Sequence, residues 1–282
     1  MTDQRPTKTT FASNLDEVRA RREFLESLQI EHGPHALLGR FFLVADRILK
    51  DLGIRLVQSS LAELVDLQTS NVTSWPLFAP MLDTRLGGVD PEMSYGFIGL
   101  DRKGAIACAQ GGRIYSSGDR SLFDLMDDHS FFYGDNCKPG SRQPYCSATA
   151  PSARTIRGVF TYSGALWVHP EHRGQRLAAL LPRLSRAFAL TRWNSAYTIA
   201  VVSEQIAASS LLAMYGYKTV EPGFRMSNIG PKDYVGYLMS MTSDDLLNDL
   251  SLFLSGKFAE IDPAVSNSGN QHKFLPPAKF NR

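Results

Sequence analysis

The sequence has few cysteines, no excess of charge of either sign and no long apolar run. Its three cysteines are too few and too odd in number for a disulfide framework, so we expect a cytoplasmic protein. Thirty basic and 28 acidic residues leave a formal net charge of +2, which favours neither nucleic acid nor an anionic membrane as a partner. The first 14 residues lack the apolar segment of a secretory signal, and the apolar stretch 36–52 is too short and too charged to span a bilayer.

What is present is the composition of a globular protein with a sizeable core, since 43% of the residues are hydrophobic and 21% are charged. Periodicity and turn signals predict the elements along the chain. We expect helices over 15–29, 35–52, 60–69, 75–86 and 243–254, and strands over 54–58, 94–100, 105–115, 195–203, 217–220 and 234–241.

One stretch is organised as a strand, a tight turn and a helix. Residues 159–168 are β-branched and aromatic, and they end before Pro170, where a central strand cannot continue. After Arg173 and Gly174, apolar residues recur at helical spacing from Leu177 onward. A helix N-terminus leaves N–H groups unpaired and carries the positive end of the helix dipole, and Gly174 has no Cβ to hold a ligand away. We therefore predict that this turn holds a phosphate group.

The amino-acid sequence of this turn resembles the signature of the GNAT superfamily, the acyl-CoA-dependent N-acyltransferases. The family pattern is V-x-P-x-x-R-G-x-G-x-G/A, of which [RQ]-x-x-G-x-[GA] surrounds the pyrophosphate of coenzyme A. The residues that fit are Val168, Pro170, Arg173, Gly174 and Ala178. Arg176 replaces the second glycine. Because the family's contacts here use mainly backbone amides, an arginine that points outward keeps the function, and it can add a charged contact to a phosphate.

A second segment, residues 205–217, resembles the family's later pattern N-x-x-A-x-x-x-Y-x-x-x-G-F. The residues that fit are Ala208, Gly216 and Tyr217, with Gln205 in place of asparagine. Leu212 stands where many relatives have a tyrosine that protonates the departing thiolate. That role is therefore unfilled at its usual position.

The resemblance implies an α/β fold with a mixed central sheet flanked by helices. We expect residues 1–53 to be a leader and a helical extension that packs on the core or on the second subunit of a homodimer. Residues 54–261 are the expected acyltransferase domain, in which the Gly-, Ser- and Asp-rich segment 117–157 is an inserted loop before the central strand. Residues 262–282 are the expected flexible tail.

The resemblance also implies acetyl-CoA as co-substrate, held by the end of the strand, by the turn and by the later segment. The expected contacts are Leu166, Trp167, Val168, Arg173, Gly174, Gln175, Arg176, Leu177, Ala178 and Ser209. We expect no metal, because the spacing of Cys137, Cys146 and His129 matches no usual zinc pattern.

Acetyl transfer to an amine needs a deprotonated nucleophile and a proton donor for the thiolate. The strand that carries a carboxylate base in relatives has Gly164 and Ala165 here. Glu204 is the carboxylate best placed to be the base, although a helix N-terminal charge is an equally simple interpretation of it. Tyr215, one turn from Leu212, is the candidate acid, and a core aromatic is its alternative interpretation.

These observations predict an N-acetyltransferase that moves an acetyl group from acetyl-CoA to a primary amine of a small molecule. Two alternatives stay open: a protein or peptide amine as acceptor, and a non-catalytic acyl-CoA-binding module. The segment 117–157 is either an acidic lid for a cationic amine or an acidic surface loop. The acidic residues on which this expectation rests are Asp124, Asp127, Asp128 and Asp135.

Overall fold

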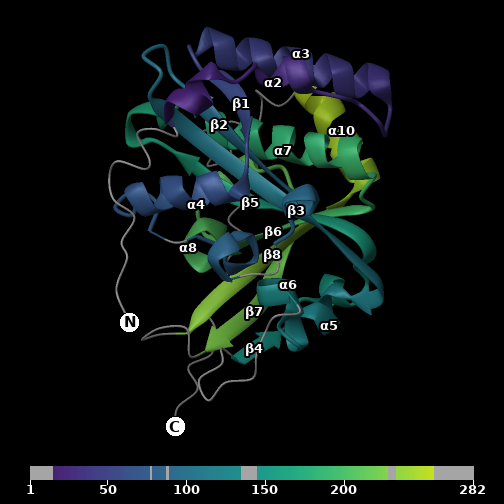
Figure 1. Cartoon of the computed structure of the whole chain (residues 1–282). Coiled ribbons are helices and arrows are strands. Elements are labelled where there is room, and N and C mark those ends of the chain that lie inside the picture. Colours follow the sequence, from purple (N-terminus) through teal and green to yellow (C-terminus); the bar gives the residue numbers. More distant parts are fainter. Residues whose placement is uncertain (1–14, 77, 87–88, 135–144, 228–232, 257–282) are drawn as a thin grey trace, which may run out of the picture.

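The computed structural model describes residues 15–76, 78–86, 89–134, 145–227 and 233–256, and it is organised around a mixed sheet (Figure 1). Among these residues the sheet has eight strands in the order β1-β2-β3-β5-β6-β8-β7-β4. Of the neighbouring pairs in that order, β5 and β6 run parallel and the others antiparallel. The strands are β1 (Arg55–Ser59), β2 (Ser94–Leu100), β3 (Ile106–Ser121), β4 (Tyr145–Ala148), β5 (Arg157–Val168), β6 (Tyr197–Ser203), β7 (Thr219–Ser227) and β8 (Tyr234–Thr242).

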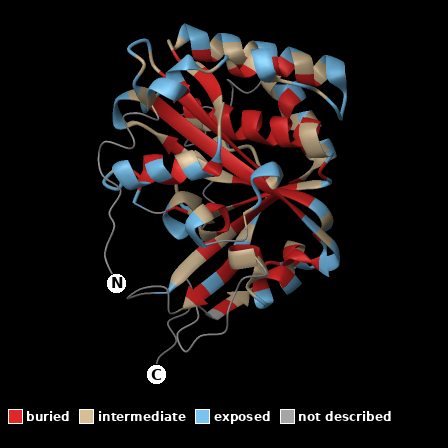
Figure 2. Cartoon of the chain, in the orientation of Figure 1, coloured by how far each residue is buried: buried red, intermediate tan, exposed pale blue. Residues whose placement is uncertain are grey.

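Helices cover both faces of the sheet, which confirms the expected fold class. One face carries α2 (Phe24–Ser27), α3 (His35–Asp51), α7 (Leu177–Trp193) and α10 (Ser243–Leu254), whose apolar residues form one core with β1 to β3. The other face carries α4 (Leu61–Ser70), the short 3-10 helices η1 (Pro80–Leu82) and η2 (Thr84–Leu86), α5 (Leu122–Asp127) and α6 (Ser130–Tyr133). Strand β2, the first part of β3 and most of α7 are buried (Figure 2).

Local signals fix several of these elements. A capping box begins α4, because the Ser60 side chain accepts from the Glu63 N–H and the Glu63 carboxylate accepts from the Ser60 N–H. The predicted strands β2 and β3 form a hairpin around Asp101, which accepts hydrogen bonds from the N–H groups of Lys103 and Ala105. Helix α10 begins with another capping box, formed by Thr242 and Asp245.

Two predicted helices are wrong in extent or type. The helix expected over 15–29 is helical over 15–20 and then breaks before α2, because the carbonyl groups of Arg19 and Arg21 accept hydrogen bonds from the Arg55 guanidinium. The helix expected over 75–86 is replaced by η1 and η2, since Pro80 has no N–H to continue an α-helical ladder.

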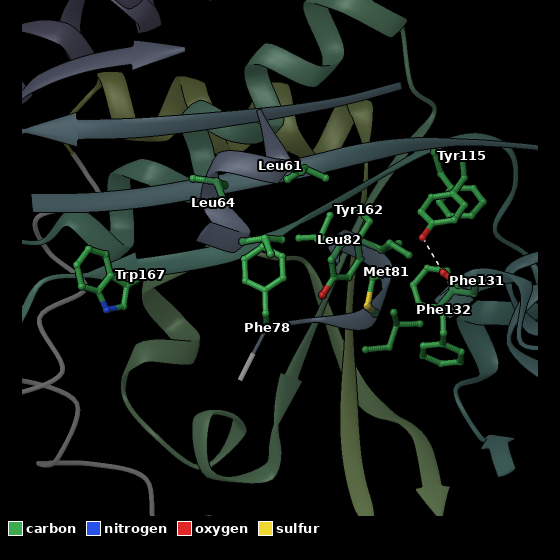
Figure 3. Close-up of a cluster of buried hydrophobic side chains, with 14 of the residues drawn as sticks. Leu61, Leu64, Phe78, Met81, Leu82, Tyr115, Phe131, Phe132, Tyr162 and Trp167 are labelled. Atoms are coloured by element: carbon green, nitrogen blue, oxygen red, sulfur yellow. Dashed lines mark hydrogen bonds between the residues drawn. The ribbon is translucent and has the colours of Figure 1, made fainter. Parts of the chain in front are cut away.

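The segment 117–157 is not an irregular loop over its described part. Strand β3 continues to Ser121, which caps α5 with Asp124, and β4 adds an edge strand beside β7. The rings of Phe131 and Phe132 on α6 are buried, and the Tyr115 hydroxyl donates to the Phe131 carbonyl at 2.7 Å (Figure 3). The segment was expected to be a loop because of its Gly-, Ser- and Asp-rich composition.

Several expectations concern residues outside the described ranges. The leader before residue 15 and the tail 262–282 lie there, as do Asp135 and Cys137. No helix in the described part of the chain has the length and apolarity needed to cross a membrane.

Candidate active site

The two parallel strands in the middle of the sheet separate part of the way along their length. Strands β5 and β6 pair through Phe160 with Tyr197, Thr161 with Thr198, and Tyr162 with Ile199, and there the pairing ends. Beyond it, β5 continues to Val168 along β3, and β6 continues to Ser203 along β8. Their facing edges therefore diverge and leave an opening between residues 163–168 and 200–203.

A β-bulge shapes the β5 side of this opening. The register of β5 on β3 shifts between the Ala109–Trp167 pair and the Gly111–Gly164 pair, which leaves one extra residue on β5. At the shift, Ala165 has a φ of +53°, a left-handed conformation that a residue with a Cβ adopts at a cost of about 1 kcal/mol. Such a bulge turns the main chain away from its neighbouring strand and toward the opening.

A cavity of about 680 Å³ occupies this opening. Its walls come from β5 and β6, from the helices that follow them, from β7 and β8, and from the segments around η1 and α6. The residues of the two diverging strands that line it are Tyr162, Ser163, Gly164, Ala165, Leu166, Ala200, Val201, Val202 and Ser203. A volume of this size is typical of a small-molecule site.

The predicted phosphate turn directly follows β5. A 3-10 turn at Pro170–His172 leads through Gly174, with a φ of +80°, to Arg176, which precedes α7. In the described chain, no turn or loop hydrogen bond uses the backbone N–H groups of residues 174–178, and Arg176 makes no side-chain cap. The turn therefore presents a row of free donors at the positive end of a 17-residue helix.

Arg176, which replaces the second glycine of the family pattern, still adopts a backbone conformation typical of glycine. Arg176 has a φ of +60°, in the left-handed region that glycine adopts without cost, and its side chain is exposed. Arg173 is also exposed, and its Nε donates to the Val168 carbonyl at 3.3 Å. Both guanidinium groups thus lie on the surface beside the free amides, where an anion would meet them.

Other residues predicted to contact coenzyme A have different surroundings. Trp167 turns its ring into the core, where it stacks on Trp75 at 5.7 Å and donates from Nε1 to the Ser74 hydroxyl. Ser209 donates to the Ile206 carbonyl and accepts from the Leu211 N–H. The remaining predicted contacts divide between the cavity wall, the strand end and the turn: Leu166 lines the cavity, Val168 pairs with Cys108, Leu177 is buried, and Gln175 and Ala178 are partly buried.

The two candidate catalytic residues lie in unlike places. Tyr215 follows the short helix α9 (Leu211–Met214) and lines the cavity, while the Arg186 guanidinium donates to its carbonyl at 2.7 Å. Burial raises the pKa of the Tyr215 phenol, so it is protonated at neutral pH. Glu204 begins α8 (Glu204–Ala207), is exposed, and is not a residue of the cavity wall. Its role as a base remains a prediction.

Two buried arginines, which the sequence analysis did not identify, fix the position of Tyr215. Arg183 and Arg186 on α7 are fully buried, and both contact the Asp249 carboxylate of α10, at 2.8 Å and 3.3 Å. Arg183 also donates to the Met214 carbonyl. The sequence did contain a signal for this cluster, namely two arginines in the middle of a largely apolar helix. Arginines at such positions are buried only when a carboxylate pairs with them.

A polar network between β3, β5 and α7 forms another part of the site that was not predicted. The Gln110 amide donates from Nε2 to the Gly164 carbonyl at 2.9 Å and to the Ser163 hydroxyl at 3.2 Å. The hydroxyls of Ser163, Ser185 and Tyr95 continue the network. Gln110 is 2% exposed and lines the cavity, yet its Oε1 has no hydrogen-bond partner.

The inserted segment contributes rings, not carboxylates, to the cavity wall. Its lining residues are Phe132 and Tyr133. Asp124 accepts hydrogen bonds from Ser121 at the start of α5, and Asp128 forms an ion pair with Arg120, while Asp119 and Asp127 are exposed. The described acidic residues therefore lie outside the cavity wall, as expected of an acidic surface loop, while Asp135 lies outside the described residues.

Pro182 lies inside α7 and lines the same cavity. The helix continues through it to Trp193.

Within the described residues there is no group of His, Cys, Asp and Glu side chains that could hold a metal ion.

Comparisons with known proteins return solved acetyltransferase structures at low sequence identity and low TM-score. No protein-family model and no curated protein sequence matches the chain. A structure of Arabidopsis thaliana NAA60 in complex with acetyl-CoA covers 68% of this chain and 99% of its own, at 12% identity and a TM-score of 0.43. Vibrio cholerae spermidine N-acetyltransferase in complex with CoA and spermine covers 68% and 98%, at 12% identity and a TM-score of 0.38. TM-scores and identities this low carry no argument about the function of this chain.

Proposed function

We propose that this chain is an acetyl-CoA-dependent N-acetyltransferase that acts on a primary amine of a small molecule. The observation that carries the proposal is the opening between β5 and β6 beyond the Tyr162–Ile199 pair, with free backbone donors at 174–178 directly after β5. A thioester on a long, flexible, phosphate-bearing carrier matches this combination of an open strand edge and an anion site.

Each part of the co-substrate has a counterpart in this arrangement. The N–H groups of 174–178 and the Arg173 guanidinium would bind the pyrophosphate. The main chain of Leu166 to Val168 would hold the pantetheine as an added strand, and the bulge at Ala165 would direct the thioester into the cavity. Tyr215 would donate a proton to the departing thiolate.

The size of the cavity, about 680 Å³, favours a small acceptor over a polypeptide, because small-molecule sites have volumes in this range. The inserted segment contributes Phe132 and Tyr133 to its wall, and the chain around η1 contributes Pro80 and Met81. Holding both reactants here in reacting geometry supplies acceleration of the order of 7–11 kcal/mol in well-oriented cases.

The proposal is tested by measuring thiol release from acetyl-CoA in the presence of small amines and of peptides, together with a CoA titration. We expect CoA to bind and at least one small amine to be acetylated. Acetylation of peptides alone would indicate a protein acceptor. CoA binding without turnover on any amine would indicate an acyl-CoA-binding module, and a lack of CoA binding would refute all three.

A further inference from the structure

The cavity wall consists largely of rings and apolar groups. Its residues include Trp75, Phe132, Tyr133, Phe224, Met226 and Tyr234. None of the described residues that line the cavity carries a carboxylate, an ammonium or a guanidinium group. Its titratable side chains are the phenols of Tyr133, Tyr162, Tyr215, Tyr217 and Tyr234.

This wall is poorly suited to a protonated amine. Moving an ammonium group from water into an apolar site costs several kcal/mol unless a carboxylate accompanies it. The cation must also lose a proton before its nitrogen can attack, and the described wall holds no carboxylate or imidazole that would take it. A nitrogen that is already neutral meets neither difficulty.

We propose, on the premise of the acetyltransferase function above, that the acceptor is an aromatic amine that is uncharged at neutral pH and is bound among these rings. The nitrogen lone pair forms a bond to the thioester carbon, and the C–S bond breaks with its electron pair on sulfur. Tyr215 gives its proton to the sulfur and is reprotonated by the proton that the nitrogen releases. The products are an aryl acetamide and a free thiol, with no net uptake of protons and no carboxylate base.

This inference is tested by comparing thiol release with 2-naphthylamine and with 2-naphthylmethylamine as acceptors. The two amines share a ring system but differ in the charge of the nitrogen at neutral pH. Burial raises the pKa values of Tyr162, Tyr215, Tyr217 and Tyr234, so these phenols do not titrate near neutrality. We expect kcat/KM for thiol release to favour 2-naphthylamine at least about tenfold at pH 7. We also expect its kcat/KM to be flat between about pH 6 and pH 9, where the nitrogen stays neutral.

A preference for 2-naphthylmethylamine at pH 7 would overturn the inference and leave the proposed function intact. So would acetylation of alkylamines with no turnover of 2-naphthylamine. Absence of CoA binding would instead refute the proposed function, and the inference with it.

Discussion

Tyr162 of β5 and Ile199 of β6 form the last pair of the parallel ladder, and beyond them the two strands separate. The rest of the candidate site follows from that divergence. The freed edge of β5 leads over the bulge at Ala165 to the phosphate turn, and the space between the strands becomes the cavity that Tyr215 and Gln110 line.

Covering the free amides of the turn should weaken CoA binding. Gly174 has a φ of +80°, and a Cβ built there meets no atom within 4 Å, so Gly174→Trp adds an indole over the turn without a clash. We expect the Kd for CoA, measured by isothermal titration, to rise at least about tenfold, since charge-assisted hydrogen bonds are lost.

Gly158→Trp is the matched control for that change. Gly158 has a φ of +76° and equally open space, and it lies at the opposite end of β5. Both variants carry the same backbone strain, of about 1 kcal/mol. Equal loss of CoA affinity in the two variants would mean that strain, and not the turn, is responsible.

Tyr215→Phe should lower kcat on the order of 10²-fold with KM for acetyl-CoA unchanged, because it removes the proposed proton donor. Burial raises the pKa of this phenol above its ordinary value of 10.0, so the donor form persists through neutral and mildly alkaline solution. Wild-type kcat should therefore be flat on the alkaline side until the pH exceeds the ordinary tyrosine pKa. An unchanged kcat in the variant would remove Tyr215 from the mechanism.

Glu204→Gln serves as the comparison. Because Glu204 is exposed and away from the cavity wall, we expect this variant to keep the wild-type pH profile of kcat/KM. A rate that falls mainly at low pH would instead identify Glu204 as the base that the sequence predicts.

Removing the shared partner of the two buried arginines should destabilise the fold and the site together. Asp249→Asn leaves Arg183 and Arg186 buried without a carboxylate, a change that costs about 3–5 kcal/mol. Denaturant unfolding measures this cost. Asp244→Asn, an exposed change in the first turn of the same helix, should cost no more than about 1 kcal/mol. Similar losses in both variants would contradict a specific role for the buried cluster.

The contact between the N-terminal extension and α4 should make stability fall in acid. Burial opposes the charge of Glu63, but hydrogen bonds from Arg21, Ser60 and Ser59 outweigh it and lower the Glu63 pKa from 4.5 to about 2. A carboxyl group with a lowered pKa adds stability that is complete above pH 4.5 and is lost as the pH falls toward 2. We expect this loss to be about 1–2 kcal/mol after solvent screening.

Thermal unfolding of the wild type and of Arg21→Met between neutral pH and acid checks this expectation. The variant should be less stable near neutrality, and its difference from the wild type should shrink as the pH falls below 4.5. A difference that stays constant with pH would show that the ion pair with Glu63 does not carry the effect.

Local chemistry explains which parts of the fold could be predicted. The helix at 60–69 and the two strands on either side of Asp101 were predictable, because the capping box at Ser60 and Glu63 and the turn after Asp101 each depend on a few neighbouring residues. The inserted segment was misjudged because its burial depends on distant partners: Phe132 packs against Phe224, which lies far along the chain.

The cavity wall was beyond sequence reasoning for the same reason. Trp75, Gln110, Phe132 and Tyr234 lie in four separate segments, and nothing in their spacing indicates that they meet. The divergence of β5 and β6 is also a tertiary effect, since each strand keeps its other neighbour. In contrast, the phosphate turn was predictable because strand, turn and helix are consecutive in the chain.

The most direct test is a crystal structure of the chain grown with CoA. We expect the pyrophosphate on the N–H groups of residues 174–178 and the pantetheine between residues 166–168 of β5 and the diverging end of β6. Electron density for CoA at any other place, or a chain that does not bind CoA at concentrations that saturate acyltransferases, would contradict the function proposed for this opening.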